Sequence, residues 1–104
     1  MNLSRSARQA AASVRMEAVA APLAVVENVD PAMVYYLDLP ESKTTRLPAA
    51  RIRVALRAGW RVLVGTTELP PDILSHNAIA VRARVRLQQS EYLVIERLGR
   101  RQSG

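Results

Sequence analysis

Residues 79–98, IAVRARVRLQQSEYLVIERL, decide the fold that this sequence predicts. The first part alternates between apolar residues and arginines, which indicates a β-strand with one buried and one solvated face. The apolar positions are Ile79, Val81, Ala83, Val85 and Leu87. Residues 92–95 are all apolar, which is typical of a strand covered on both faces. We therefore expect a hairpin of residues 79–87 and 91–98, turning at residues 88–90, with the second strand central in its sheet.

Two earlier hairpins are predicted by the same period of two. Residues 23–29 and 33–39 are short runs of β-branched and aromatic residues on either side of Asp30-Pro31, which suits a turn. In residues 51–57, Ile52, Val54 and Leu56 alternate with more polar positions, and Ala58-Gly59 leads to a further strand over 60–66. Residues 40–50 carry two prolines and little apolar content, so we expect an exposed loop there.

Helices are expected in only two places. Residues 4–21 are rich in helix-forming residues, with Ser4 as a cap and Pro22 as the stop. The least polar stripe of this helix consists of small side chains, at Leu3, Ala7, Ala10, Val14 and Ala18. After Pro70-Pro71, Asp72 is a candidate cap for one helical turn near residues 72–76.

These elements predict one mainly β domain of the α+β class over residues 1–104. The N-terminal helix over 4–21 is followed by a β-domain over 23–98. Its six antiparallel strands form a barrel or a strongly curled sheet, because a small sheet must protect its edges. An open sheet backed by a helix is the alternative. Residues 99–104 are expected to be a disordered basic tail.

Composition argues against an enzyme. The 104 residues contain no Cys, one His and four scattered glycines, which excludes thiolate chemistry, a Cys/His zinc cluster and a glycine-rich phosphate loop. Ser75 and His76 are adjacent, which does not supply the geometry of a nucleophile and its base. We expect no catalytic residue, no cofactor, no metal and no small-molecule substrate. The uncharged runs are too short to span a bilayer, so we expect no membrane partner and a cytoplasmic location.

The charge of the chain lies after its midpoint. The formal net charge is +6, and 14 of the 15 basic residues are Arg. Residues 1–50 carry five basic and five acidic residues, so the excess belongs to residues 51–104. Six arginines form two ladders of period two on predicted strands, namely Arg51, Arg53, Arg57, Arg82, Arg84 and Arg86. Neighbouring ladders would form a face that attracts phosphate, so nucleic-acid binding is one hypothesis. A solvated or protein-facing surface is the other.

The order of elements resembles that of small bacteriophage head–tail joining and tail-completion proteins. The resemblance rests on AMVYYLDLPES at 32–42, RVLVGTTELPPD at 61–72 and YLVIERLG at 92–99, together with the N-terminal helix. The chain departs from that pattern at Asn77-Ala78, where family members often have Gly-Asp. It departs again at residues 88–90, where the closing turn lacks a glycine.

The resemblance implies a non-enzymatic structural protein of the virion that assembles with copies of itself or with other particle proteins. The exposed loop and the N-terminal helix would then order on assembly. Within the loop, the candidate assembly contacts are Lys43, Thr44, Thr45 and Arg46. A small basic barrel that binds nucleic acid through the arginine ladders remains the alternative function.

Overall fold

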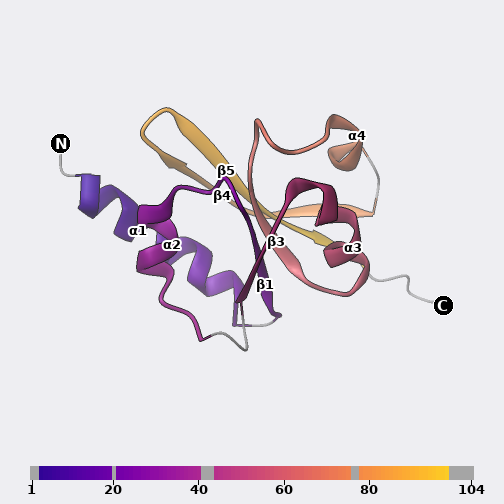
Figure 1. Ribbon diagram of the computed structural model, residues 1–104, viewed down its shortest axis with the longest axis horizontal. Helices are drawn as coiled ribbons and strands as arrows, with labels where there is room; N and C mark the ends of the chain where they lie inside the picture. Colours follow the sequence, from indigo (N-terminus) through magenta and orange to yellow (C-terminus); the bar gives the residue numbers. More distant parts are fainter. Residues whose placement is uncertain (1–2, 20, 41–43, 76–77, 99–104) are drawn as a thin grey trace.

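The computed structural model describes residues 3–19, 21–40, 44–75 and 78–98, and shows an α+β fold around an open, mixed sheet (Figure 1). The five strands lie in the order β2-β1-β3-β5-β4. The α+β class is confirmed, but the barrel of six antiparallel strands is wrong. Two of the six expected strands are helices, and the sheet keeps two separate edges.

The sheet has a parallel half and an antiparallel half. β1 (Leu23–Val26) runs parallel to β2 (Thr44–Leu47) on one side and to β3 (Arg61–Gly65) on the other. β5 (Ser90–Arg97) pairs antiparallel with β3 and with β4 (Ile79–Leu87), which forms the second edge. The predicted C-terminal hairpin and its central second strand are therefore confirmed.

The segment expected as a strand over 33–39 is helix α2 (Pro31–Leu37). Asp30 caps this helix by accepting a 2.8 Å hydrogen bond from the N–H of Ala32, and Pro31 occupies the first turn. Both features are N-terminal helix signals, because a capping carboxylate satisfies a free N–H and proline needs none. Met33 and Leu37 lie four residues apart and are both buried. Asp30-Pro31 is thus a helix start and not a hairpin turn.

The segment expected as a strand over 51–57 is also helical. A short 3-10 turn, η2 (Ala49–Arg51), leads into α3 (Ile52–Arg57). Ile52, Ala55 and Leu56 are buried at helical spacing, whereas Val54 is 52% exposed. A short run with apolar residues at 52, 54 and 56 is compatible with a strand of period two and also with a helix of period 3.6. The burial of Ala55 next to Leu56 shows that the helical period applies here.

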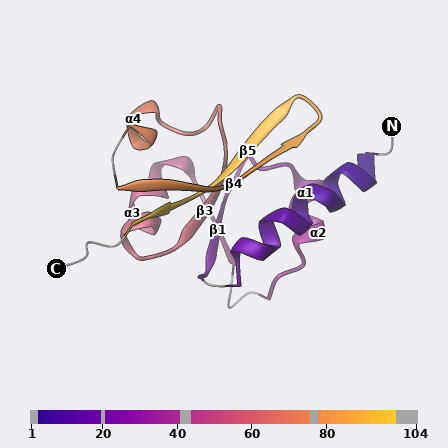
Figure 2. The same cartoon turned by 180° about the vertical axis from the view of Figure 1, so that it is seen from behind.

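β2 lies inside the segment that was expected to be a loop over 40–50, so that expectation is wrong for residues 44–47. The parallel strands β1, β2 and β3 need crossover connections, and α2 and α3 provide them. The connection from β1 through α2 leads to β2 on one side of β1, and the connection from β2 through α3 leads back past β1 to β3 on its other side. Because both crossovers are expected to be right-handed, opposite directions place α2 and α3 on opposite faces of the sheet. Figures 1 and 2 show α3 and α1 on opposite sides of the strands.

The N-terminal helix expected over 4–21 is α1, which spans Leu3–Glu17 and packs against α2 and β4. Its contact stripe is built from small side chains, and the members whose burial is described are Ala7, Ala10, Ala11, Val14 and Ala18. Small side chains let a helix backbone approach its neighbours closely. Four positions of the predicted stripe, Ala7, Ala10, Val14 and Ala18, are therefore confirmed as buried, Ala11 joins them, and the side chain of Leu3 lies outside what the structure describes.

The helical turn expected near residues 72–76 is present as α4 (Pro71–Leu74), but Pro70 occupies its capping position and no side chain caps it. Asp72 therefore does not cap it. His76 and the tail over 99–104 lie outside the described residues, so those expectations are not addressed by the structure. No described helix is long and apolar enough to cross a membrane.

A β-bulge divides β4 into two parts. Val81 lies opposite Ile95 and Ala83 lies opposite Val94, so Arg82 is an extra residue between the two pairs. Because directly opposed residues in an antiparallel pair share a face, the bulge changes which face the following residues occupy. Val81 therefore lies on the side of the sheet covered by α3, called the α3 face. Ala83 lies on the other side, called the α1 face.

The single apolar face predicted for residues 79–87 is therefore wrong. Ile79 and Val81 belong to the α3 face, whereas Ala83, Val85 and Leu87 belong to the α1 face. Val81 is 42% exposed, which confirms that it does not join the buried row. Among the arginines, Arg82 contacts groups on the α1 face, and Arg84 lies opposite Leu93 on the α3 face.

Candidate anion-binding site

The structure separates the six arginines that the sequence analysis grouped in two ladders. Arg51, Arg53 and Arg57 lie on η2 and α3, on a helix and not on a strand. Arg82, Arg84 and Arg86 lie on β4. The two triplets are not neighbouring strands, so the expected face of six parallel guanidinium groups does not form. Whether any of them binds nucleic acid stays a prediction.

Two of the β4 arginines are paired within the protein. Arg82 lies 3.3 Å from the Glu96 carboxylate and 3.9 Å from that of Glu17. Arg84 donates to the carboxylate of Glu91 at 3.1 Å. Arg86 is exposed, and no described acidic residue pairs with it. The net positive charge of this ladder is therefore much smaller than its sequence suggests.

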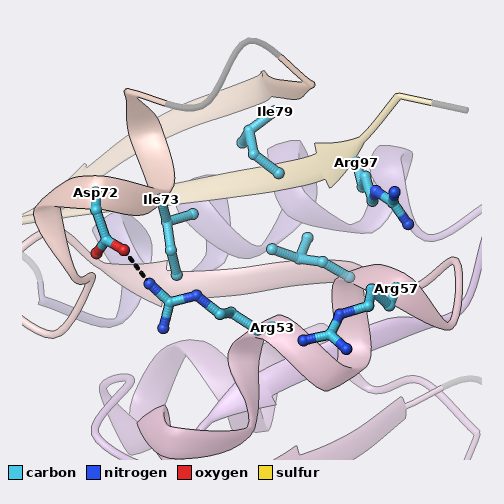
Figure 3. Close-up of a pocket in the computed structure, with 7 residues that line it drawn as sticks. Arg53, Arg57, Asp72, Ile73, Ile79 and Arg97 are labelled. Atoms are coloured by element: carbon cyan, nitrogen blue, oxygen red, sulfur yellow. Dashed lines mark hydrogen bonds and ion pairs between the residues drawn. The ribbon is translucent and has the colours of Figure 1, made fainter. Parts of the chain in front are cut away.

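Three other arginines gather around a hollow on the α3 face, the arginine pocket (Figure 3). Its volume is about 250 Å³. Arg53 and Arg57 come from α3, and Arg97 comes from the end of β5. The hollow is further lined by Leu56, Asp72, Ile73 and Ile79. Sequentially distant segments thus build the site: α3, α4, the start of β4 and the end of β5.

Local structure explains how these side chains meet. Arg53 and Arg57 are four residues apart on α3, so they lie on the same side of the helix. Leu56 is buried between this helix and the sheet, which fixes the orientation of α3. Arg97 is the register partner of Ile79, so both lie on the α3 face at the end of the β4–β5 hairpin. The buried Ile73 holds α4 against the same hollow.

The charges of the arginine pocket are unbalanced. Arg53 forms an ion pair with Asp72, and both side chains are exposed, at 51% and 69%. Arg57 and Arg97 have no ionic partner among the described residues. Three guanidinium groups and one carboxylate leave a formal charge of +2 around one small hollow. An anionic group would relieve the repulsion between the guanidinium groups and would accept hydrogen bonds from their N–H groups.

The pocket is suited to an anion that carries an apolar group. Guanidinium groups bind carboxylate or phosphate through paired hydrogen bonds. Leu56, Ile73 and Ile79 give the hollow an apolar lining beside its charged rim. The nearby Ser75 hydroxyl donates to the carbonyl of Asp72 at 2.9 Å, and no group of three His, Cys, Asp or Glu residues gathers in the described chain.

Sequence reasoning found part of this site. It named Arg53 and Arg57, although on the wrong kind of element, and it considered Asp72 only as a cap. Arg97 was not predicted, because it lies beside α3 only as a result of the strand order, in which β5 is next to β3. No local sequence pattern indicates this position. Of the candidate assembly contacts, Thr44, Thr45 and Arg46 lie on β2 at the opposite edge of the sheet. Lys43 lies outside the described residues.

Comparisons with protein-family models, with curated proteins and with solved structures give no significant match.

Proposed function

We propose that this protein is a non-enzymatic binding and assembly protein, and that its arginine pocket holds an acidic segment of a partner protein. One observation carries the proposal. Arg53, Arg57 and Arg97 surround an apolar hollow in which Asp72 is the only carboxylate among the described lining residues. The ligand is expected to place an Asp or Glu carboxylate against the guanidinium groups and an adjacent aliphatic side chain against the lining.

The lining favours a peptide over nucleic acid. A phosphate backbone needs a track of positive charge and gains little from aliphatic side chains. From Ile79 to Arg84, β4 advances five residues, or about 17 Å, and Arg84 is already paired with Glu91. The arginine pocket is therefore a local site and not the end of a continuous track. Asp72 at its rim would also repel a second phosphate.

Nucleic-acid binding remains the second candidate because Arg84 and Arg86 lie on the α3 face, the same side of the sheet as the pocket. A long polyanion that follows this face would contact Arg86 as well as Arg57 and Arg97. A short acidic peptide in the pocket would not reach Arg86. This difference separates the two candidates experimentally.

The test is a binding titration at about 50 mM salt, in which fluorescence anisotropy of the labelled probe reports binding. The probes are a labelled peptide that mixes Glu and Leu, a neutral peptide with Gln in place of Glu, and a single-stranded DNA of equal charge. The variants are Arg57→Gln with Arg97→Gln, and Arg86→Gln as the matched control that removes an exposed charge elsewhere. We expect the acidic peptide alone to bind, and the double variant to weaken it about tenfold, while the control leaves it unchanged.

Two results would overturn this proposal. In the first, the acidic peptide binds no better than its Gln counterpart. In the second, DNA binds more tightly and the control variant weakens it as much as the double variant does, which establishes nucleic-acid binding instead. The wider expectation of a phage head–tail or tail-completion component stays a prediction, tested by concentration-dependent ring formation of the purified chain.

A further inference from the structure

A second surface lies at the free edge of β2. β2 pairs only with β1, and no described strand pairs with its outer side. The carbonyl of Leu47 accepts a 3.0 Å hydrogen bond from the N–H of Glu27, so the backbone groups of Leu47 point toward the β1 side. Successive residues in a strand alternate, so the backbone N–H and C=O groups of Thr44 and Arg46 point outward. No backbone group in the described part of the chain pairs with them, so they are available to another chain.

A groove runs beside this edge on the α3 face. Its volume is about 480 Å³, almost twice that of the arginine pocket. The apolar lining residues are Leu47, Pro48, Val54, Ala55, Ala58 and Trp60. Val54 is 52% exposed and Trp60 is only partly buried, so apolar surface is open to a ligand here.

The charges around the groove have one sign. Arg46 and Arg51 line it, and no residue of the described chain that lines it is acidic. Arg46 donates through Nη2 to the main-chain carbonyl of Glu27 at 2.7 Å, which leaves its other N–H donors available. Arg51 has no ionic partner among the described residues. A ligand that brings carboxylates would be complementary to this rim.

We infer that the edge of β2 accepts an extended segment of a partner protein with alternating apolar and acidic residues. The segment pairs its backbone with Thr44 and Arg46 as an added outer strand. Its apolar side chains enter the groove between Leu47 and Trp60. Its carboxylates point to the other side of the added strand, where the side chain of Arg46 lies, because Arg46 is the register partner of Val25 on the α1 face. This is recognition by strand addition, in which the backbone gives register and a side-chain groove gives specificity.

The groove and the arginine pocket are separate sites. The groove is lined by Val54 and Ala55 of α3 and by Arg51 of the preceding turn η2. The pocket is lined by other residues of the same helix, namely Arg53, Leu56 and Arg57. The helix lies between them. The inference therefore does not depend on the function proposed for the pocket, and each can fail while the other stands.

Trp60 makes this inference directly testable, because it is the only tryptophan in the chain and it lines the groove. The probe is a short unlabelled peptide of alternating Val and Glu, added to the full chain while tryptophan emission is recorded. We expect a saturable shift of the emission to shorter wavelength as the peptide covers the indole. The variant with Arg57→Gln and Arg97→Gln is expected to show the same shift, because Trp60 does not line the arginine pocket.

Two modifications test the mode of binding. N-methylation of alternate amides removes the N–H groups that pair with β2, and is expected to weaken binding at least about tenfold. Val54→Glu places a negative charge in the groove at an exposed position and is expected to weaken binding similarly. The matched control is Val19→Glu, because Val19 is 75% exposed and does not line the groove.

The inference is wrong if the peptide leaves Trp60 emission unchanged up to about millimolar concentration. It is also wrong if the N-methylated peptide binds as well as the parent, because the backbone of β2 then plays no part. Equal binding by the Val54→Glu variant would exclude the groove. A variant that fails to fold does not affect the N-methylation test, which uses the unmodified protein.

Discussion

Arg61 on β3 joins the end of α1 to the middle of the sheet through Glu17. Its Nη1 donates to the main-chain carbonyl of Glu17 at 2.8 Å and to the carboxylate of the same residue at 3.1 Å. Its Nε lies 3.4 Å from the Glu96 carboxylate on β5. Arg61 is 7% exposed and is the only buried charged residue among those described. Arg82 lies near the carboxylates of the same two glutamates and completes the ion-pair cluster.

Replacing this arginine is expected to destabilise the protein more than any other single change of an arginine. Arg61→Met leaves the carboxylates of Glu17 and Glu96 without their buried partner. Removal of one member of a buried pair costs about 3–5 kcal/mol, and the partial exposure of both glutamates lowers this to about 2–3 kcal/mol. Urea unfolding measures the change, and Arg86→Gln serves as a control near zero. A loss below about 0.5 kcal/mol for Arg61→Met would contradict the structural role.

The small side chains on α1 are expected to be required at specific positions. Ala11 is 1% exposed in the contact of α1 with its neighbours, whereas the adjacent Ala12 is exposed. Ala11→Leu overfills this contact and is expected to cost about 1–3 kcal/mol. Ala12→Leu adds the same atoms in solvent and is expected to have little effect. Thermal unfolding of both variants gives the comparison, and equal stabilities would show that α1 packs loosely.

The cap of α2 is expected to be measurable. Asp30→Ala removes the acceptor of the Ala32 N–H and is expected to cost about 1 kcal/mol of unfolding free energy, while Asp30→Ser retains a capping oxygen and loses less. Chemical denaturation of the two variants and the parent chain provides the measurement. If Ala and Ser are equivalent at this position, the hydrogen bond contributes nothing to stability.

The ion pair of Asp72 is expected to limit anion binding and to contribute little to folding. Asp72→Asn raises the formal charge of the arginine pocket from +2 to +3 and frees Arg53. We expect binding of the Glu/Leu peptide to strengthen about threefold, with stability changed by less than about 1 kcal/mol because the pair is exposed. Anisotropy and urea unfolding measure the two effects. Weaker peptide binding would mean that Asp72 orients Arg53 for its ligand.

Strong local patterns predicted about half of this fold. The hairpin of β4 and β5, the strands β1 and β3 and the helix α1 follow from long apolar runs and from the small-residue stripe. Residues 31–37 and 52–57 were misassigned because short β-branched runs fit both periods. The decisive signals there were the Asp30-Pro31 helix start and the buried Ala55, and only the second of these needs the structure to be seen.

The candidate site was harder to predict than the fold because it depends on topology. Arg57 and Arg97 are 40 positions apart in the sequence, and they meet only because β5 crosses the sheet next to β3. The bulge at Arg82 leaves no local mark in a sequence that alternates regularly from 81 to 87. The sequence therefore indicated an excess of arginine but not its distribution over the two faces.

The bulge at Arg82 gives β4 one residue more than its pairing with β5 requires. Deletion of this residue would make Val81 and Ala83 adjacent, and both parts of the strand would keep the sides of the sheet that they now occupy, because adjacent strand residues alternate. Ile79 would stay in the wall of the arginine pocket and Leu87 would stay on the α1 face, while the ion pairs of Arg82 with Glu17 and Glu96 would be lost. A relative with one residue fewer at this point is therefore expected to keep both the pocket and the contact with its N-terminal helix, without the extra charge beside Arg61.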